Sequence, residues 1–232
     1  MNLPIFNFTK IESTNDFAKS LITKHKIFKG IVIADEQTKG RGTYGNHWSS
    51  PKGNLYFTIF FPILRNNLKK IQFLVQLQIK NILKTYNIKN IALKWPNDLY
   101  INAKKVCGIL QESIIFGKFY LIIGIGINVK SSPRIKKYPT TFLNKETKKK
   151  INLNELVEKL KNAFTVNIIN KKYSFKKISA NWNKYALYKN KFINFELNNR
   201  IYKGIFKGIN NNGALILEHN NHKDYFTHGR IV

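Results

Sequence analysis

A glycine-rich segment at residues 40–48, Gly-Arg-Gly-Thr-Tyr-Gly-Asn-His-Trp, has the residue types that could handle a charged ligand. Glycines let a backbone turn sharply, or let its N–H groups come close to a ligand. Arginine offers planar, permanently charged donors that suit carboxylate or phosphate oxygens. The segment lies between two apolar stretches, at 31–34 and 54–61, so it also fits a plain surface turn. Taken alone, it leaves both interpretations open.

Other polar segments accompany it along the chain. They are Glu-Ser-Thr-Asn at 12–15, Gln-Thr-Lys at 37–39, Lys-Trp-Pro-Asn-Asp at 94–98, Lys-Lys-Val-Cys-Gly at 104–108 and Gly-Ile-Gly-Ile-Asn at 124–128. The last of these lacks the third glycine of a dinucleotide-binding motif. Any one glycine motif would be weak evidence. The value of the segments lies in their occurring together and in this order.

In that order, the segments resemble those of the biotin protein ligases, also called biotin–[acetyl-CoA-carboxylase] ligases. The resemblance runs from about residue 8 to the C-terminus, and Gly-Arg-Gly together with Lys-Trp-Pro-Asn-Asp is highly specific. It implies an enzyme that uses ATP and Mg²⁺ to activate biotin as biotinyl-5′-AMP. A lysine of the biotin carboxyl carrier protein of acetyl-CoA carboxylase would then take the biotinyl group.

The resemblance also implies roles for individual residues. Lys105 and Arg41 would be catalytic, because a carboxylate that attacks a phosphate needs cations where negative charge gathers. The residues implied for biotin binding are Ser13, Thr14, Asn15, Gln37, Gly40, Arg41, Gly42, Thr43, Lys105, Gly108 and Gly124. Those implied for ATP or the adenylate are Arg41, Trp48, Asn97, Lys105 and Asn128. Asp98 would hold or orient Mg²⁺, with pairing to a nearby lysine as the alternative.

Structural interpretations compete at several of these positions. The segment 13–15 also fits pure helix capping, and both roles can hold at once. Cys107 lies in an apolar run and is expected to be small core filler. Three histidines at 219, 222 and 228 have no cysteine or carboxylate at ligand spacing, so no metal site is expected there.

The glycine segment departs from the family pattern at two positions. Thr43 and Asn46 stand where many family members carry basic residues. The family resemblance implies a disordered loop here that closes over biotin. We therefore expect this loop to hold the adenylate less tightly, and to release more of it.

Periodicity and turn signals predict the elements that must position these residues. Strands are expected at 3–8, 31–34, 54–61 (ending before Pro62), 91–93, 99–101, 106–110 and 119–123, with a hairpin turn at 102–104. Helices are expected after Ser13, over 68–86, and after Asn152 in a capping box with Glu155, whereas 145–150 is expected to be a loop. Further strands are expected at 192–197, 201–209 and 214–217, with a tight hairpin at 212–213.

The predicted fold class is α+β. A biotin/lipoate ligase-type catalytic domain over 1–184, with a mostly antiparallel sheet and flanking helices, precedes a small C-terminal SH3-like β-barrel over 185–232. We expect a monomer or a homodimer. Since the Ser-Thr-Asn segment begins at residue 13, we also expect no N-terminal DNA-binding domain of the kind that some biotin ligases carry.

Charge and composition narrow the class of partner. The net charge is +28, but the lysines are spread along the whole chain and the arginines are scattered, so no specific nucleic-acid partner is expected. The charge would instead attract an acidic partner. No apolar run is long enough to span a membrane, no signal peptide is evident and there is one cysteine, all of which favour the cytoplasm.

Two other functions stay open. A lipoate or octanoyl ligase would share the fold and the acyl chemistry, although Gly-Arg-Gly and Lys-Trp-Pro-Asn-Asp favour biotin. A catalytically dead cationic binding module is the more distant alternative. The presence of Arg41 and Lys105 argues against this alternative. Thr43, which stands in place of a basic residue, leaves it possible.

Overall fold

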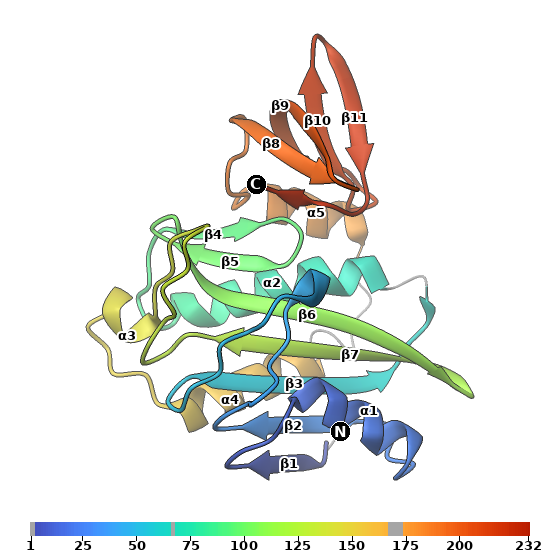
Figure 1. Cartoon of the computed structure of the whole chain (residues 1–232), viewed down its shortest axis with the longest axis vertical. Coiled ribbons are helices and arrows are strands. Elements are labelled where there is room, and N and C mark those ends of the chain that lie inside the picture. Colours follow the sequence, from blue (N-terminus) through green and yellow to red (C-terminus); the bar gives the residue numbers. More distant parts are fainter. Residues whose placement is uncertain (1–2, 66–67, 167–173) are drawn as a thin grey trace.

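The computed structural model describes residues 3–65, 68–166 and 174–232. It contains two sheets, and the smaller C-terminal sheet lies above the larger one along the long axis of the molecule (Figure 1). Among the described residues, no helix combines the length and the apolar character needed to cross a lipid bilayer.

The larger sheet has seven strands in the order β1-β2-β3-β7-β6-β5-β4. They are β1 (Ile5–Phe8), β2 (Gly30–Ala34), β3 (Leu55–Pro62), β4 (Ile91–Lys94), β5 (Asp98–Ile101), β6 (Lys104–Phe116) and β7 (Lys118–Ile127). Only the β1–β2 pair is parallel, which confirms the prediction of a mostly antiparallel sheet.

The predicted strand boundaries need two corrections. β3 continues through Pro62, because its pairing with β2 ends at Phe60 and the missing N–H of proline breaks no bond on that side. The β6–β7 ribbon is much longer than expected and projects from the sheet in Figure 1. In its outer part, exposed side chains alternate with partly buried ones, and Ile114 and Phe116 pack against the cluster that α1 forms on one face.

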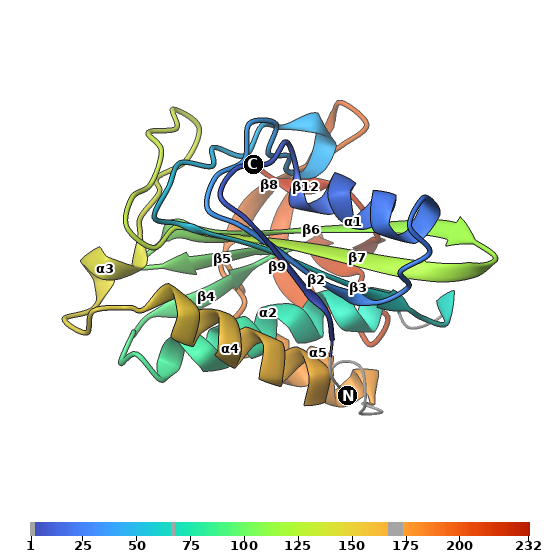
Figure 2. The same ribbon diagram turned by 90° about the horizontal axis from the view of Figure 1, so that it is seen from below.

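Helices cover both faces of this sheet (Figure 2). On one face lies α1 (Thr14–Thr23), and on the other lie α2 (Leu68–Lys84), α4 (Leu153–Phe164) and α5 (Phe175–Asn183). A one-turn helix, α3 (Leu143–Glu146), takes up part of the predicted 145–150 loop. Neither α3 nor α5 was expected from the sequence, because each is too short to show a clear helical period.

Local side-chain bonds explain where two of these helices begin. Ser13 accepts a hydrogen bond from the Asp16 N–H at the start of α1, as predicted. The Asn152 side chain accepts from two backbone N–H groups at the start of α4. The other half of the expected capping box is replaced, since the carboxylate of Glu155 pairs with Lys159 one turn later.

The C-terminal sheet contains five antiparallel strands in the order β11-β10-β9-β8-β12. They are β8 (Phe192–Leu197), β9 (Arg200–Ile209), β10 (Leu215–His219), β11 (His222–Phe226) and β12 (Arg230–Ile231). Gly213 has a positive φ of 78° in the predicted hairpin. Over the described strands, β11 and β12 stay at opposite edges, so the expected barrel is an open sheet.

The two sheets are joined by buried contacts near β4. Trp95 is almost fully buried, and its ring centroid lies 5.7 Å from that of Phe195 in β8. Its indole N–H donates to the Gly213 carbonyl at 3.3 Å. Trp95 therefore belongs to the core, whereas the domain boundary between residues 184 and 185 stays a prediction.

Candidate functional site

One cavity gathers most of the residues singled out in the sequence. It lies among the start of α1, the glycine loop (residues 40–48), the β5–β6 region and the middle of β7. Its lining consists of Ser13, Thr14, Asn15, Gln37, Arg41, Gly42, Thr43, Trp48, Tyr56, Asn97, Asp98, Lys105, Gly108, Ile109, Leu110, Gly124, Ile125 and Gly126. Of the candidate residues, Gly40 and Asn128 are the two outside this lining.

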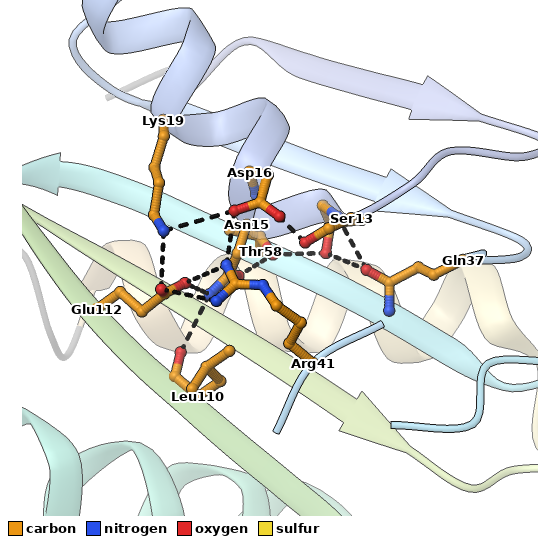
Figure 3. Close-up of polar contacts among 10 residues, drawn as sticks. Ser13, Asn15, Asp16, Lys19, Gln37, Arg41, Thr58, Leu110 and Glu112 are labelled. Atoms are coloured by element: carbon orange, nitrogen blue, oxygen red, sulfur yellow. Dashed lines mark hydrogen bonds and ion pairs between the residues drawn. The ribbon is translucent and has the colours of Figure 1, made fainter. Parts of the chain in front are cut away.

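The floor of the cavity is a network of buried polar side chains (Figure 3). The hydroxyl of Thr58, in β3, lies 2.8 Å from Oγ1 of Thr14 and 2.7 Å from Oδ1 of Asn15. The amide of Asn15 donates to the carboxylate of Glu112, in β6, at 2.8 Å. Buried polar groups cost free energy unless they are bonded, so this network fixes each side chain in one orientation.

Gln37 extends the network toward the glycine loop. Its Oε1 accepts from both the backbone N–H and the hydroxyl of Thr14, at 2.8 and 3.0 Å. Its Nε2 donates to the hydroxyl of Ser50 at 3.1 Å, and Ser50 donates to the Trp48 carbonyl at 2.9 Å. The glutamine therefore links helix α1 to the segment that follows the loop.

Arg41 lies in an ionic cluster beside this floor (Figure 3). Its Nη2 lies 2.6 Å from Asp16 and 3.1 Å from Glu112, and its Nη1 lies 3.2 Å from the second oxygen of Glu112. Lys19 binds the same Glu112 carboxylate at 2.8 Å. Arg41 thus ties the base of the glycine loop to α1 and β6, with 38% of its side chain exposed.

Glu112 is the acceptor that this cluster shares. Burial acts to raise its pKa, but hydrogen bonds from Lys19, Asn15 and Arg41 outweigh burial and hold the pKa of the carboxyl below its ordinary value. The carboxylate consequently stays charged through the neutral range. Two cations and one amide then depend on it for their positions.

Lys105 forms the second charged centre, at the start of β6. Its Nζ lies 2.8 Å from Oδ2 of Asp98, and only 13% and 17% of the two side chains are exposed. Burial by itself lowers the pKa of Lys105, but the charge of Asp98 outweighs it, so the pKa lies above the ordinary value. An ammonium that is charged at neutral pH thereby lines the cavity.

The turn that carries Asp98 is held by amide side chains. Gln76, in α2, donates to the carbonyls of Lys94 and Asp98 at 3.3 and 3.1 Å, and accepts from the Trp182 indole at 2.8 Å. Asn97 donates to the Ile109 carbonyl at 2.7 Å. Asn97, expected near the adenylate, therefore lines the cavity while its amide N–H₂ holds β6 in place.

The glycines of β6 and β7 make room for side chains of this protein. A Cβ on Gly108 would lie 2.7 Å from the Trp48 ring, and one on Gly126 would collide with the same ring. A Cβ on Gly124 would collide with the amide of Asn15. We expected the backbone at Gly108 and Gly124 to approach a ligand, but a tryptophan ring and an amide already lie against them.

Trp48 separates the first cavity from a second one. Its indole N–H is buried and has no hydrogen-bond partner among the described residues. The second cavity also contacts Lys105 and is mostly apolar; its lining is His47, Trp48, Ser49, Lys105, Asn128, Pro133, Ile135, Tyr138 and Thr140. Asn128 lies here, with its amide donating to the Thr141 carbonyl at 3.1 Å.

The glycine loop itself is a hydrogen-bonded turn. Gly42 N–H donates to the Asn46 carbonyl at 2.7 Å, and Trp48 N–H donates to the Gly40 carbonyl at 2.9 Å. A Cβ on Gly40 would lie 2.5 Å from the Ser50 hydroxyl and the Trp48 carbonyl, so Gly40 serves close backbone packing. These bonds describe one conformation of the loop, and its expected disorder and closure over biotin stay a prediction.

The described residues contribute little to a magnesium site. They contain no group of three His, Cys, Asp or Glu side chains placed to hold a metal. The carboxylate of Asp98 is already engaged by Lys105. The geometry thus agrees with the alternative in which Asp98 pairs with a lysine, and its magnesium role stays a prediction. Cys107 is fully buried in the core, in agreement with a filler role.

Sequence reasoning missed several side chains that build this site. Thr58 and Glu112 complete the floor and the ionic cluster, and Tyr138 lines the second cavity. A threonine in an apolar strand and a glutamate in an alternating one are ordinary surface or core residues by local criteria. Only their partners, which lie tens of residues away in the chain, give them a role.

Comparison with protein-family models finds two matches. The model of the "Biotin/lipoate A/B protein ligase family" matches residues 7–129. The model of the "Biotin protein ligase C terminal domain" matches residues 190–232. The first match includes the glycine loop, Lys105 and the β7 glycines, and the second includes the C-terminal sheet.

Individual relatives point the same way. The chain is 31% identical over 198 residues to a biotin–[acetyl-CoA-carboxylase] ligase of Paracoccus denitrificans, covering 80% of this chain and 82% of that protein. It is 35% identical over 124 residues to biotin–protein ligase 2 of Arabidopsis thaliana, covering 49% of this chain. The matched part spans 36% of the plant protein's own length.

A solved structure resembles the whole fold. The biotin protein ligase of Aquifex aeolicus, determined in complex with biotin and ATP, superposes with a TM-score of 0.84 at 27% identity. The match covers 99% of this chain and 97% of that one.

Proposed function

The chain belongs to the biotin/lipoate A/B protein ligase family, and we propose that it is a biotin protein ligase, which activates biotin with ATP and transfers it to a lysine of a carrier protein. The observation that carries this proposal is the convergence of Lys105 and Arg41 on one cavity with a polar floor. Biotin would lie on that floor, and the adenine of ATP would enter the apolar second cavity beyond Trp48.

In the first step, a carboxylate oxygen of biotin attacks the α-phosphorus of ATP. A new P–O bond forms, the bond to the β-phosphate oxygen breaks, and pyrophosphate leaves with that electron pair. Both reactants are anions, so their approach requires fixed positive charge in a site with little water. Lys105 suits this role because Asp98 keeps it charged and in one place.

In the second step, a neutral lysine amine of the carrier attacks the acyl carbon of biotinyl-5′-AMP. The C–N bond forms, the C–O bond to the phosphate breaks, AMP leaves and the amine loses a proton. We propose the biotin carboxyl carrier protein of acetyl-CoA carboxylase as the acceptor, on the strength of the Paracoccus relative's name. A net charge of +28 favours an acidic carrier surface.

Two residues near the glycine loop could contact the adenylate. The buried N–H of Trp48 has no partner among the described residues, and Trp48 lines both cavities. Thr43 lines the first cavity from the glycine loop. A hydrogen-bond acceptor of the adenylate placed there would satisfy the indole N–H, whose burial without a partner is otherwise unfavourable.

ATP–pyrophosphate exchange with either biotin or lipoate as the acid tests the proposal. Exchange that depends on biotin is the expected result, and the matching C-terminal domain model supports biotin over lipoate. Exchange that depends on lipoate would assign the chain to the other branch of its family. Exchange with neither acid would leave a binding module as the better explanation.

A further inference from the structure

We propose that Tyr44 is a positioning residue through which the C-terminal sheet holds the glycine loop over the site. The Tyr44 hydroxyl donates to the carbonyl oxygen of Gly229 and accepts from the N–H of Gly229, both at 3.0 Å. Gly229 directly precedes β12, at the edge of the C-terminal sheet. This one side chain therefore links the tip of the loop to the second matched domain.

The C-terminal side of this contact is rigid. Gly229 has a φ of +122°, and a Cβ there would collide with the Phe195 ring and lie 2.8 Å from the Glu196 carbonyl. The next residue, Arg230, binds the Glu196 carboxylate through two hydrogen bonds of 2.8 Å. The packed sheet thus fixes the position and direction of the Gly229 peptide groups.

The loop side of the contact is strained and depends on it. Tyr44 has a φ of 57°, in the left-handed region that residues other than glycine adopt only when their surroundings require it. Burial of the side chain does not explain this backbone conformation, because 62% of Tyr44 is exposed. The two hydrogen bonds to Gly229 are the contacts that explain its placement.

The loop transmits this position to the cavity. Two backbone bonds, from Gly42 to Asn46 and from Trp48 to Gly40, join the legs of the turn on either side of Tyr44. One leg carries Arg41, whose ionic cluster holds the base of the loop. The turn of residues 43–45 rises from the larger sheet toward the C-terminal sheet (Figures 1 and 2).

The loop therefore has two anchors, one ionic at its base and one neutral at its tip. Loss of the Tyr44 hydroxyl should let the tip move while the base stays attached. The kinetic consequence rests on the proposed function: biotin and its adenylate would leave more easily, although no reacting atom touches Tyr44. The KM for biotin should then rise more than kcat falls.

Hydrogen–deuterium exchange of the ligand-free full chain tests the contact without reference to activity. Tyr44→Phe should exchange about three- to tenfold faster over residues 40–48 and around Gly229, as expected for a lost hydrogen bond of ordinary strength. Tyr225→Phe removes a hydroxyl from an exposed ring of the same sheet and should leave both segments unchanged. Unchanged exchange in Tyr44→Phe would overturn the proposal.

Pyrophosphate exchange kinetics test the consequence. A several-fold higher KM for biotin in Tyr44→Phe, with kcat within about twofold of the wild type, is the expected result. Faster deuterium exchange with an unchanged KM would overturn the positioning role. If the wild type itself shows no exchange with biotin, the proposed function fails, whereas the deuterium measurement still decides whether the tether exists.

Discussion

Lys105 and Arg41 are cations of the same cavity held in opposite ways. Lys105 is buried against a single carboxylate, that of Asp98. Arg41 is more exposed and shares two carboxylates, Asp16 and Glu112, with a neighbouring lysine. In a buried one-to-one ion pair, the electrostatic interaction is little screened by water and both side chains stay in place. In an exposed cluster the interactions are screened, and the side chains can rearrange.

The difference suggests a division of labour. Lys105 has the environment of a group that acts on the reacting atoms, because its electrostatic interactions are stronger in a buried, low-dielectric site than in water. Arg41 has the environment of a clamp, since its charge is already balanced by carboxylates of α1 and β6. The family resemblance implies catalytic roles for both cations, and from these two environments we propose different ones.

Replacing Lys105 should have the largest effect. In Lys105→Ala we expect biotin-dependent pyrophosphate exchange to fall by about 100- to 1,000-fold, the usual loss when one charge-stabilising donor is removed. Lys104→Ala is the matched control and should stay close to the wild type. Circular dichroism should show that Lys105→Ala is folded. Near-normal exchange in that folded variant would show that Lys105 has no special role compared with Arg41.

Removing the charge of Asp98 should change how Lys105 titrates. In the wild type the pKa of Lys105 is raised, so the cation survives into strongly alkaline solution and is lost only as the pH rises through that value. In Asp98→Asn burial dominates and the pKa falls. The alkaline loss of kcat/KM for exchange should then occur at lower pH. An unmoved alkaline limb would mean that Asp98 does not control this lysine.

The Arg41 cluster should respond to acid instead. We expect Glu112→Gln to lower the free energy of unfolding by about 1 kcal/mol at neutral pH, a typical value for a partly screened ionic contact. Because the pKa of Glu112 is depressed in the folded protein, its contribution is present above the ordinary value of 4.5 and is lost as the pH falls through the folded pKa.

Urea unfolding over a pH series measures this difference. The gap between Glu112→Gln and the wild type should close in acid. Glu158→Gln is the control, since its carboxylate pairs with Lys161 on the outer side of α4 and is largely exposed. A gap that stays constant with pH would show that the cluster does not depend on the charge of Glu112.

The smallest effect is expected at Thr43. Thr43→Arg adds a cation to the cavity wall, and release of biotinyl-5′-AMP should slow by about two- to fivefold, the worth of one modest hydrogen bond. Biotinylation of bystander proteins should fall with it. Thr23→Arg adds the same charge at the exposed end of α1, and equal slowing in that variant would attribute the effect to net charge alone.

Much of the fold could be predicted because it rests on local signals. The caps at Ser13 and Asn152, the hairpin at 212–213 and the apolar face of α2 all depend on residues a few positions apart. The length of the β6–β7 ribbon could not be predicted. Its glycines contribute no side chain to the alternating pattern, and the polar residues at 111–113 interrupt its apolar positions.

The candidate site shows the same limit. The family resemblance selected Arg41 and Lys105, and their charge suits a reaction between two anions. They could not reveal that Glu112 would take up the charge of Arg41, because 71 residues separate the two. Nor could they reveal that the indole of Trp48 would lie against glycines of two distant strands.

The amino-acid sequence by itself determined which elements form and which groups could do chemistry, because these follow from backbone preferences and side-chain type over short distances. Tertiary structure alone decided which carboxylate each cation meets, which glycine each ring covers and that Tyr44 reaches Gly229. Those pairings depend on long-range geometry and on burial. Burial leaves the charge of Lys105 little screened by water, whereas the more exposed Arg41 is screened.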